Sequence, residues 1–220
     1  MPKKRVRRTR IKVCGMTRVD DVQHAVSQGV DAIGMILHAN SPRAIGLDQA
    51  ALIRQAVPAF ISLVGVFVDA EQAFIEQAID QAGIDLIQLH GNETEEHGQA
   101  LSRPYIKAIR AKSAEQVNQD CKLFPSAQAI LLDPYVAGQH GGTGQELSLD
   151  LWPQELSSNN EARSLILAGG LSPENVADRI AALAPYAVDM NSGLERSPGF
   201  KDKALLEQAI MEVQRADNIG

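Results

Sequence analysis

The sequence predicts an α/β fold in which eight strand–helix units close into a single-domain (β/α)8 TIM barrel. Short apolar runs alternate with amphipathic runs of helical spacing along the chain, and eight such pairs can be counted. A helix between successive strands returns the chain in the same direction, so the strands run parallel. No linker or change in composition divides the 220 residues. We therefore expect one barrel over residues 11–220, and a doubly wound open sheet is the alternative.

The expected strands are apolar on both faces, which is typical of a parallel sheet covered by helices. In chain order they cover residues 10–13, 32–37, 61–68, 86–90, 105–109, 129–132, 165–168 and 186–190.

The expected helices lie between these strands, and several end at a Gly or Pro that stops a helix. They are expected at residues 19–28, 48–57, 69–83, 93–101, 113–119 and 149–156, from Ser172 onward, and in a last helix with Leu205, Leu206, Ala209, Ile210 and Val213 on one face. Asp69 with Gln72 resembles a capping box, and Ser172 with Pro173 is typical of an N-cap and a first helical residue.

Composition favours a cytoplasmic protein. Hydrophobic residues make up 45% of the chain, but no apolar run is long enough to span a membrane and none follows the basic start as in a secretory signal. The only two cysteines, Cys14 and Cys121, lie far apart and form no disulfide or zinc pattern, which fits a reducing compartment. We expect no membrane partner.

The first ten residues are strongly basic. They carry six of the 21 Lys and Arg side chains and no acidic residue, which leaves 15 basic against 27 acidic residues in the rest. Such a segment is typical of a disordered leader or of an arm that binds nucleic acid. Because the rest of the chain is acidic, we expect residues 1–10 to be a leader and we expect no nucleic-acid partner.

Two ionisable residues stand at the ends of expected strands. Cys14 follows the strand at 10–13, and Asp133 follows the strand at 129–132. Active sites of TIM barrels lie at the carboxyl ends of the strands. A thiol and a carboxyl facing each other there can act as general base and general acid if their pKa values are shifted. Taken singly, Cys14 is more typical of a core thiol and Asp133 of a turn cap; the pairing favours catalysis.

The last two strands are followed by small residues suited to phosphate. Gly169 and Gly170 follow the seventh strand, and Ser192 and Gly193 follow the eighth. Glycine lets backbone N–H groups approach phosphate oxygens, and a following helix N-terminus adds a favourable dipole. Ordinary turn chemistry is the alternative. Because TIM barrels commonly bind phosphate at these two loops, we expect a phosphate site here.

The loop after the sixth strand, residues 133–146, is also rich in glycine. Gly142, Thr143 and Gly144 form either a third backbone cradle for substrate or a hinge that lets the loop close over the site and exclude water. Of these, we favour a mobile loop that faces the substrate.

Motifs at these strand ends closely resemble the phosphoribosylanthranilate isomerase family, in the right order from residue 10 to about residue 213. They are residues 12–17, 41–43, 65–68, 88–91, 132–133 with 141–144, 167–176, and 189–195 with 198–199 and 201–202. The resemblance implies isomerisation of N-(5′-phosphoribosyl)anthranilate to 1-(2-carboxyphenylamino)-1-deoxy-D-ribulose 5-phosphate in tryptophan biosynthesis. That reaction is an Amadori rearrangement and needs no cofactor. The chain departs from the family pattern at Met190-Asn191, where Val-Ser is more usual.

The resemblance also implies roles for single residues. Asp133 is the acid that protonates the furanose ring oxygen, and Cys14 is the base that removes the C2′ proton. Arg43 binds the anthranilate carboxylate, a task suited to a forked guanidinium. His90 either lines the substrate pocket or satisfies a polar contact there. Lys12 lies two residues before Cys14, on the same side of the strand, where its charge would favour a thiolate.

Two other functions remain open from the sequence. One is isomerisation or epimerisation of a phosphosugar with a different aglycone. The other is a catalytically silent phosphate-binding barrel whose basic leader recruits RNA. The Cys14 and Asp133 pair favours an enzyme, and no closely spaced ligands favour a metal site. We expect a small-molecule phosphosugar as partner, and a monomer or a homodimer.

Overall fold

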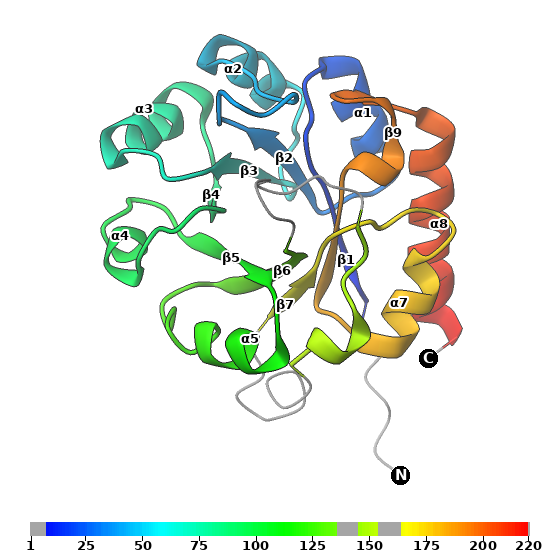
Figure 1. Cartoon of the computed structure of the whole chain (residues 1–220). Coiled ribbons are helices and arrows are strands. Elements are labelled where there is room, and N and C mark those ends of the chain that lie inside the picture. The colour runs from blue at the N-terminus through cyan, green and yellow to red at the C-terminus, as the bar shows by residue number, and fades with distance from the viewer. Residues whose placement is uncertain (1–7, 136–144, 154–163, 220) are drawn as a thin grey trace.

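The computed structural model describes residues 8–135, 145–153 and 164–219, and in it eight parallel strands form a closed barrel in the order β1 to β8 (Figure 1). The predicted TIM barrel is confirmed, and the open-sheet alternative is wrong because β8 pairs with β1. The strands are β1 (Arg10–Val13), β2 (Ala32–Ile36), β3 (Ser62–Phe67), β4 (Leu86–Leu89), β5 (Tyr105–Ala111), β6 (Ala129–Pro134), β7 (Leu165–Leu167) and β8 (Ala187–Met190).

Helices surround the barrel, each following a strand, as Figure 1 shows. They are α1 (Val19–Ser27), α2 (Leu47–Gln55), α3 (Gln72–Ala82), α4 (Glu95–Gln99), α5 (Ala114–Asp120), α7 (Val176–Leu183) and α8 (Lys203–Ile219), with short 3-10 helices η1 (Leu149–Leu151) and η2 (Ser192–Leu194). The apolar face predicted for the last helix is confirmed, since Leu206, Ala209, Ile210 and Val213 are buried in α8. No helix in the described part of the chain is long and apolar enough to cross a membrane.

Two buried clusters distinguish the two faces of the strands. The larger one combines strand and helix residues, so it fills the space between the barrel and its helices. The smaller one contains no helix residue and therefore lies inside the barrel; its members lie on β5 to β8 or, for Ala168, directly after β7: Ile106, Ala108, Ala129, Leu131, Ile166, Ala168 and Ala187. Because strand side chains alternate between faces, Asp133 and Asp189 continue this inner face two residues beyond Leu131 and Ala187.

Helix α3 begins differently from the sequence prediction. Its N-cap is Glu71, and Asp69 lies before it with a left-handed backbone (φ +48°). The carboxylate of Asp69 accepts hydrogen bonds from the backbone and side-chain amides of Asn92 instead. Asp69 thus joins the loops after β3 and β4, and it is not a helix cap.

Helix α7 also begins later than predicted, at Val176. Ser172 opens a turn in which its carbonyl accepts from the amides of Asn175 and Val176, while the Asn175 side chain accepts from the Ser172 amide. The prediction of Ser172 as N-cap was wrong because the Asn175 side chain organises this turn. Of the helix predicted at 149–156, the structure shows only η1, and residues 154–163 lie outside the described part.

A short antiparallel hairpin follows β8 and was not predicted. It pairs β9 (Glu195–Ser197) with β10 (Phe200–Lys201) before α8 begins. Its turn contains Gly199, whose φ of +79° is in the left-handed region that favours glycine. The hairpin brings Glu195 and Lys201 together beside the carboxyl end of the barrel. The leader predicted at residues 1–10 lies mostly outside the described residues and stays a prediction.

Candidate active site

The predicted acid and base lie at the carboxyl end of the barrel. Cys14 directly follows β1, and Asp133 is the penultimate residue of β6. Both are buried, with 5% and 6% of their surface exposed. Strands β1 and β6 are not neighbours in the barrel, so the two groups approach the site from different sides. This placement agrees with an acid and a base on two sides of one substrate.

Cys14 lies in a close-packed, charged environment. A Cβ placed on Gly34 of β2 would come within 2.8 Å of the Cys14 sulfur, so only glycine leaves room for the thiol there. Burial raises the pKa of the Cys14 thiol, and the ammonium groups of Lys12 and Lys201 oppose this rise. The outcome is a thiol that loses its proton reluctantly and is strongly basic once it has.

Lys12 and Asp189 form a buried ion pair beneath the thiol. The barrel register places them side by side on β1 and β8, with 2.7 Å between Lys12 Nζ and Asp189 Oδ2. Burial raises the pKa of Asp189. Burial alone would lower the pKa of Lys12, but the charges of Asp189 and Cys14 raise it overall. Lys12 is therefore a fixed cation next to Cys14.

Asp133 faces His90, which follows β4. The distance from His90 Nε2 to Asp133 Oδ2 is 3.4 Å, and the Gln88 side-chain amide donates to His90 Nδ1 at 2.9 Å. Because Nδ1 accepts in this arrangement, the proton of a neutral imidazole is on Nε2, facing the carboxyl. In the barrel order, β8 with Asp189 lies between β6, which carries Asp133, and β1, which Cys14 follows.

Three buried polar atoms in this region have no hydrogen-bond partner among the described residues. They are Asp189 Oδ1, His90 Nε2 and Gln88 Oε1. Burying such atoms unpaired costs about 1–3 kcal/mol each, so a polar ligand that paired them would recover that free energy. Their positions on the inner face of β4 and β8, or just beyond it, make the barrel mouth suited to a hydroxylated ligand.

The loops expected to bind phosphate lie against each other. Gly169 and Gly170 follow β7 with φ values of +89° and +58°, which favour glycine. Ser192 and Gly193 form the start of η2, and a Cβ on Gly193 would come within 2.1 Å of the Leu171 carbonyl oxygen. Close contact between the loops thus requires glycine. The predicted residues Gly142, Thr143 and Gly144 lie outside the described part of the chain.

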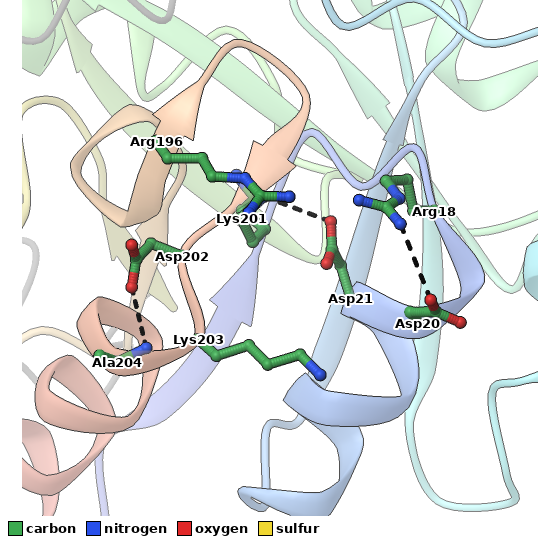
Figure 2. A pocket seen from close by; sticks show the side chains of 8 residues that line it. All are labelled: Arg18, Asp20, Asp21, Arg196, Lys201, Asp202, Lys203 and Ala204. Carbon is green, nitrogen blue, oxygen red and sulfur yellow. Dashed lines mark hydrogen bonds and ion pairs between the residues drawn. The ribbon is translucent and has the colours of Figure 1, made fainter.

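A pocket of about 380 Å³ lies beside the site, between the starts of α1 and α8 (Figure 2). The residues that line it are Arg18, Asp20, Asp21, Arg196, Lys201, Asp202, Lys203 and Ala204. Its charges are largely matched, since Arg18 lies 3.7 Å from Asp20 and Asp202 accepts from the Ala204 amide. With cations and carboxylates interleaved, the pocket favours neither an anion nor a cation.

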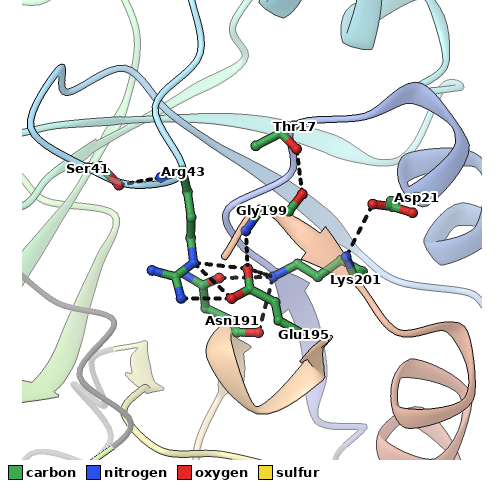
Figure 3. Close-up of polar contacts among 8 residues, drawn as sticks. All are labelled: Thr17, Asp21, Ser41, Arg43, Asn191, Glu195, Gly199 and Lys201. Carbon is green, nitrogen blue, oxygen red and sulfur yellow. Dashed lines mark hydrogen bonds and ion pairs between the residues drawn. The ribbon is translucent and has the colours of Figure 1, made fainter. Parts of the chain in front are cut away.

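Arg43 lies in the loop after β2 and is held by Glu195, as Figure 3 shows. Arg43 Nε lies 2.9 and 3.0 Å from the two Glu195 oxygens, and Nη2 lies 2.7 Å from Oε2. Lys201 Nζ donates to Glu195 Oε1 at 3.0 Å and to the carbonyl and side-chain oxygens of Asn191. Burial would raise the pKa of Glu195, but hydrogen bonds from Arg43 and the charge of Lys201 lower it overall.

This lowered pKa predicts a pH-dependent contribution of Glu195 to stability. A carboxyl whose pKa is lower in the folded state stabilises the fold above its unfolded pKa and loses that effect as pH falls through the folded value. We expect Glu195→Gln to lower the free energy of unfolding at pH 7 by about 2 kcal/mol, and the difference to shrink below about pH 4.5.

Urea denaturation at several pH values measures this difference. Glu115→Gln, at an exposed position of α5, serves as the control and should change little at any pH. A Glu195→Gln deficit that stays constant down to about pH 3 would show that the charge of Glu195 is not what stabilises the fold.

Several residues of this site were not assigned roles from the sequence. Asp189 interrupts an otherwise apolar strand, and Lys12, its register partner, is also charged. Charged residues in two buried strands were the sequence feature that could have indicated this ion pair. Glu195 and Lys201 depend on the hairpin, which no periodic pattern predicts because its strands are two and three residues long. Gln88 could have been recognised as a site residue because it is a polar residue in a buried strand.

Comparisons with known proteins identify the family to which this chain belongs. The family model described as N-(5′-phosphoribosyl)anthranilate (PRA) isomerase matches residues 11–212. N-(5′-phosphoribosyl)anthranilate isomerase of Pseudomonas fluorescens (strain Pf0-1) is 46% identical over 205 residues, which cover 93% of this chain and 98% of that protein.

Two solved structures are also similar. One is phosphoribosyl anthranilate isomerase in complex with reduced 1-(o-carboxyphenylamino)-1-deoxyribulose 5-phosphate, with a TM-score of 0.81 and 30% identity, covering 94% of this chain and 99% of that chain. The other shows monomers of the dimeric enzyme from Thermotoga maritima, with a TM-score of 0.83 and 28% identity at the same coverage. The chain belongs to the N-(5′-phosphoribosyl)anthranilate isomerase family.

Proposed function

We propose that Asp133 and Cys14 are the acid and the base with which this chain, an isomerase of tryptophan biosynthesis, converts N-(5′-phosphoribosyl)anthranilate into 1-(2-carboxyphenylamino)-1-deoxy-D-ribulose 5-phosphate. The observation that carries the proposal is the placement of two buried ionisable groups at the carboxyl ends of β1 and β6, with Asp189 on β8, which lies between these two strands in the barrel order. An Amadori rearrangement needs proton transfers at two different atoms of the sugar, and this arrangement offers one group for each.

Asp133 acts first, as a general acid. It gives its proton to the furanose ring oxygen, the bond from that oxygen to C1′ breaks, and the lone pair of the anthranilate nitrogen forms a protonated Schiff base with C1′. The Nε2–H of His90 then faces the carboxylate that remains, at the 3.4 Å separation of the free protein. A hydrogen bond to the charged form favours proton donation by Asp133.

Cys14 acts second, as a general base. Its thiolate removes the proton from C2′, and the electron pair moves into the C1′–C2′ bond while the Schiff base nitrogen becomes an amine. The resulting enol becomes the ketone when C1′ takes up a proton and the C2′ hydroxyl loses one. Carbon acids are weak, so a strongly basic thiolate suits this step, and Lys12 stabilises it by charge.

The remaining predicted residues would hold the substrate. Arg43 would bind the ring carboxylate. Backbone amides of the loops at Gly169 and Gly170 and at Ser192 and Gly193 would bind the phosphate. The unpaired atom Asp189 Oδ1 would accept a hydrogen bond from a ribose hydroxyl. Gly142, Thr143 and Gly144 would complete the phosphate side.

The wider setting is part of the same proposal. Both cysteines are buried, and a base that must form a thiolate agrees with a reducing cytoplasm. The partner is a small-molecule phosphosugar, with no nucleic acid or membrane, and the reaction needs no cofactor. The chain would act as a monomer or as a homodimer; a relative from Thermotoga maritima is described as dimeric.

Turnover of freshly generated N-(5′-phosphoribosyl)anthranilate tests the function, because the fluorescence of the anthranilate group is lost as the product forms. We expect a rapid fluorescence decay with the purified chain and only slow background decay without it. If the folded protein gave no decay, the activity would be wrong, and isomerisation of another phosphosugar would become the first alternative.

A further inference from the structure

We propose that Glu195 is a positioning residue that aims Arg43 at the carboxylate of the substrate and so helps to select an anionic aglycone. The inference rests on the proposed function, since it requires that Arg43 receives this carboxylate. It concerns a residue that contacts Arg43 and Lys201 and is not itself expected to contact the reacting atoms (Figure 3).

The hydrogen bonds of Arg43 determine which of its edges is free. A guanidinium has a side edge, formed by Nε and one terminal nitrogen, and an end edge, formed by the two terminal nitrogens. Glu195 occupies the side edge through Nε and Nη2. Among the described residues no hydrogen bond to Nη1 is found, so the end edge remains available to a second carboxylate in the paired geometry that arginine prefers.

The stem of Arg43 lies against the residue that follows the base. A Cβ on Gly15 would come within 2.8 Å of Arg43 Cδ and 2.5 Å of Asn191 Oδ1. The arginine therefore passes directly over the residue that follows Cys14. Arg43 is only 7% exposed, so other parts of the protein surround its side chain, and Gly15 has a φ of +71°, a conformation that favours glycine. An aglycone carboxylate on this edge would hold its ring close to the thiol.

Charge balance supports the same assignment. The buried group contains two cations, Arg43 and Lys201, and one anion, Glu195, which leaves one positive charge for the carboxylate of the ligand. The side chain of Glu195 is only 3% exposed, so its attraction for Arg43 is weakly screened. Glu195 thus holds the fork in place without cancelling the charge that the ligand needs.

A structural role is the competing explanation. Glu195 also accepts from Lys201 and from the Gly199 amide, so it could matter only because it holds the hairpin together. The two explanations differ in one respect. A positioning role affects ligands that carry the carboxylate and acts through Arg43, whereas a hairpin role affects every ligand and does not depend on Arg43.

The test compares two ligands and a double-mutant cycle. The ligands are reduced 1-(o-carboxyphenylamino)-1-deoxyribulose 5-phosphate and its phenylamino counterpart, which lacks only the ring carboxylate. We expect Glu195→Gln to weaken the first about tenfold and the second less than about twofold. In an Arg43→Ala background, Glu195→Gln should weaken binding of the first ligand by less than about a further twofold, because its effect acts through Arg43.

The kinetics should follow the same pattern. In Glu195→Gln, the KM for the substrate should rise about as much as the dissociation constant of the first ligand, while kcat changes only a few-fold.

Two further variants complete the test. Glu195→Asp keeps the charge and should restore part of the lost affinity, and it replaces Glu195→Gln if that variant does not fold. Asp21→Asn is the matched control: Asp21 accepts from the backbone amide of Lys201, outside the Arg43 fork, and should leave both ligands unchanged. Equal weakening of both ligands, or additive effects in the double mutant, would overturn the positioning role. If the wild type bound neither ligand, the proposed function itself would fail.

Discussion

Replacing Asp133 with Asn is expected to remove nearly all turnover, with kcat lower by about a thousandfold. Asn has nearly the same shape and still fits beside His90, but an amide has no proton to give to the ring oxygen. The furanose then opens only at the rate set by the remaining groups. Fluorescence decay of freshly generated substrate, followed under single-turnover conditions, measures the loss.

The affinity for a phosphate ligand separates this role from a binding role. Because Asp133 acts chiefly in the transition state, inhibition by ribose 5-phosphate should stay within about threefold of the wild-type value. A large loss of affinity in Asp133→Asn would contradict the assignment as acid. His90→Gln provides a comparison at the neighbouring position. We expect it to lower kcat less than Asp133→Asn does, because His90 faces the acid but does not itself donate the proton.

The barrel and the placement of the acid and base were predictable because they depend on local patterns. Apolar runs separated by helical runs specify the order of elements, and Gly29 and Gly83 stand where helices end. A residue directly after an apolar strand must lie at one end of a parallel barrel, whatever the details of packing. This is why the positions of Cys14 and Asp133 follow from the sequence alone.

The surroundings of these residues were less predictable because they depend on contacts between distant segments. Lys12 and Asp189 are 177 residues apart and meet only because β1 pairs with β8 in one particular register. Arg43 and Glu195 are 152 residues apart, and their pairing requires the hairpin after β8. At Ser172 a local cap signal was present, but the Asn175 side chain accepts from the Ser172 amide, and α7 begins only after Asn175.

The charged surroundings of Cys14 lead to the second large effect. Replacing Cys14 with Ser is expected to lower kcat by about a thousandfold or more, because a hydroxyl is far less acidic than a thiol and almost never ionises beside Lys12. Ser is smaller than Cys, so it fits against Gly34 without strain, and a loss of folding would not explain the result. Substrate turnover measures the loss, with phosphate-ligand inhibition as the control for an intact site.

A titration of the thiolate by its ultraviolet absorbance tests the same base directly. Burial raises the pKa of Cys14 above the usual 9.0, so in the free protein its thiolate should appear only at alkaline pH. Lys12 opposes that rise, so Lys12→Met should move the Cys14 step to still higher pH and lower kcat, while Cys14→Ser should remove this step. A Cys14 step that does not move in Lys12→Met would mean that the buried ion pair stabilises the fold of the barrel and does not stabilise the thiolate. Near-normal turnover by Cys14→Ser would exclude Cys14 as the base. Another group near Lys12 would then have to take the C2′ proton, and Asp189, a buried carboxyl with a raised pKa, would be the first alternative.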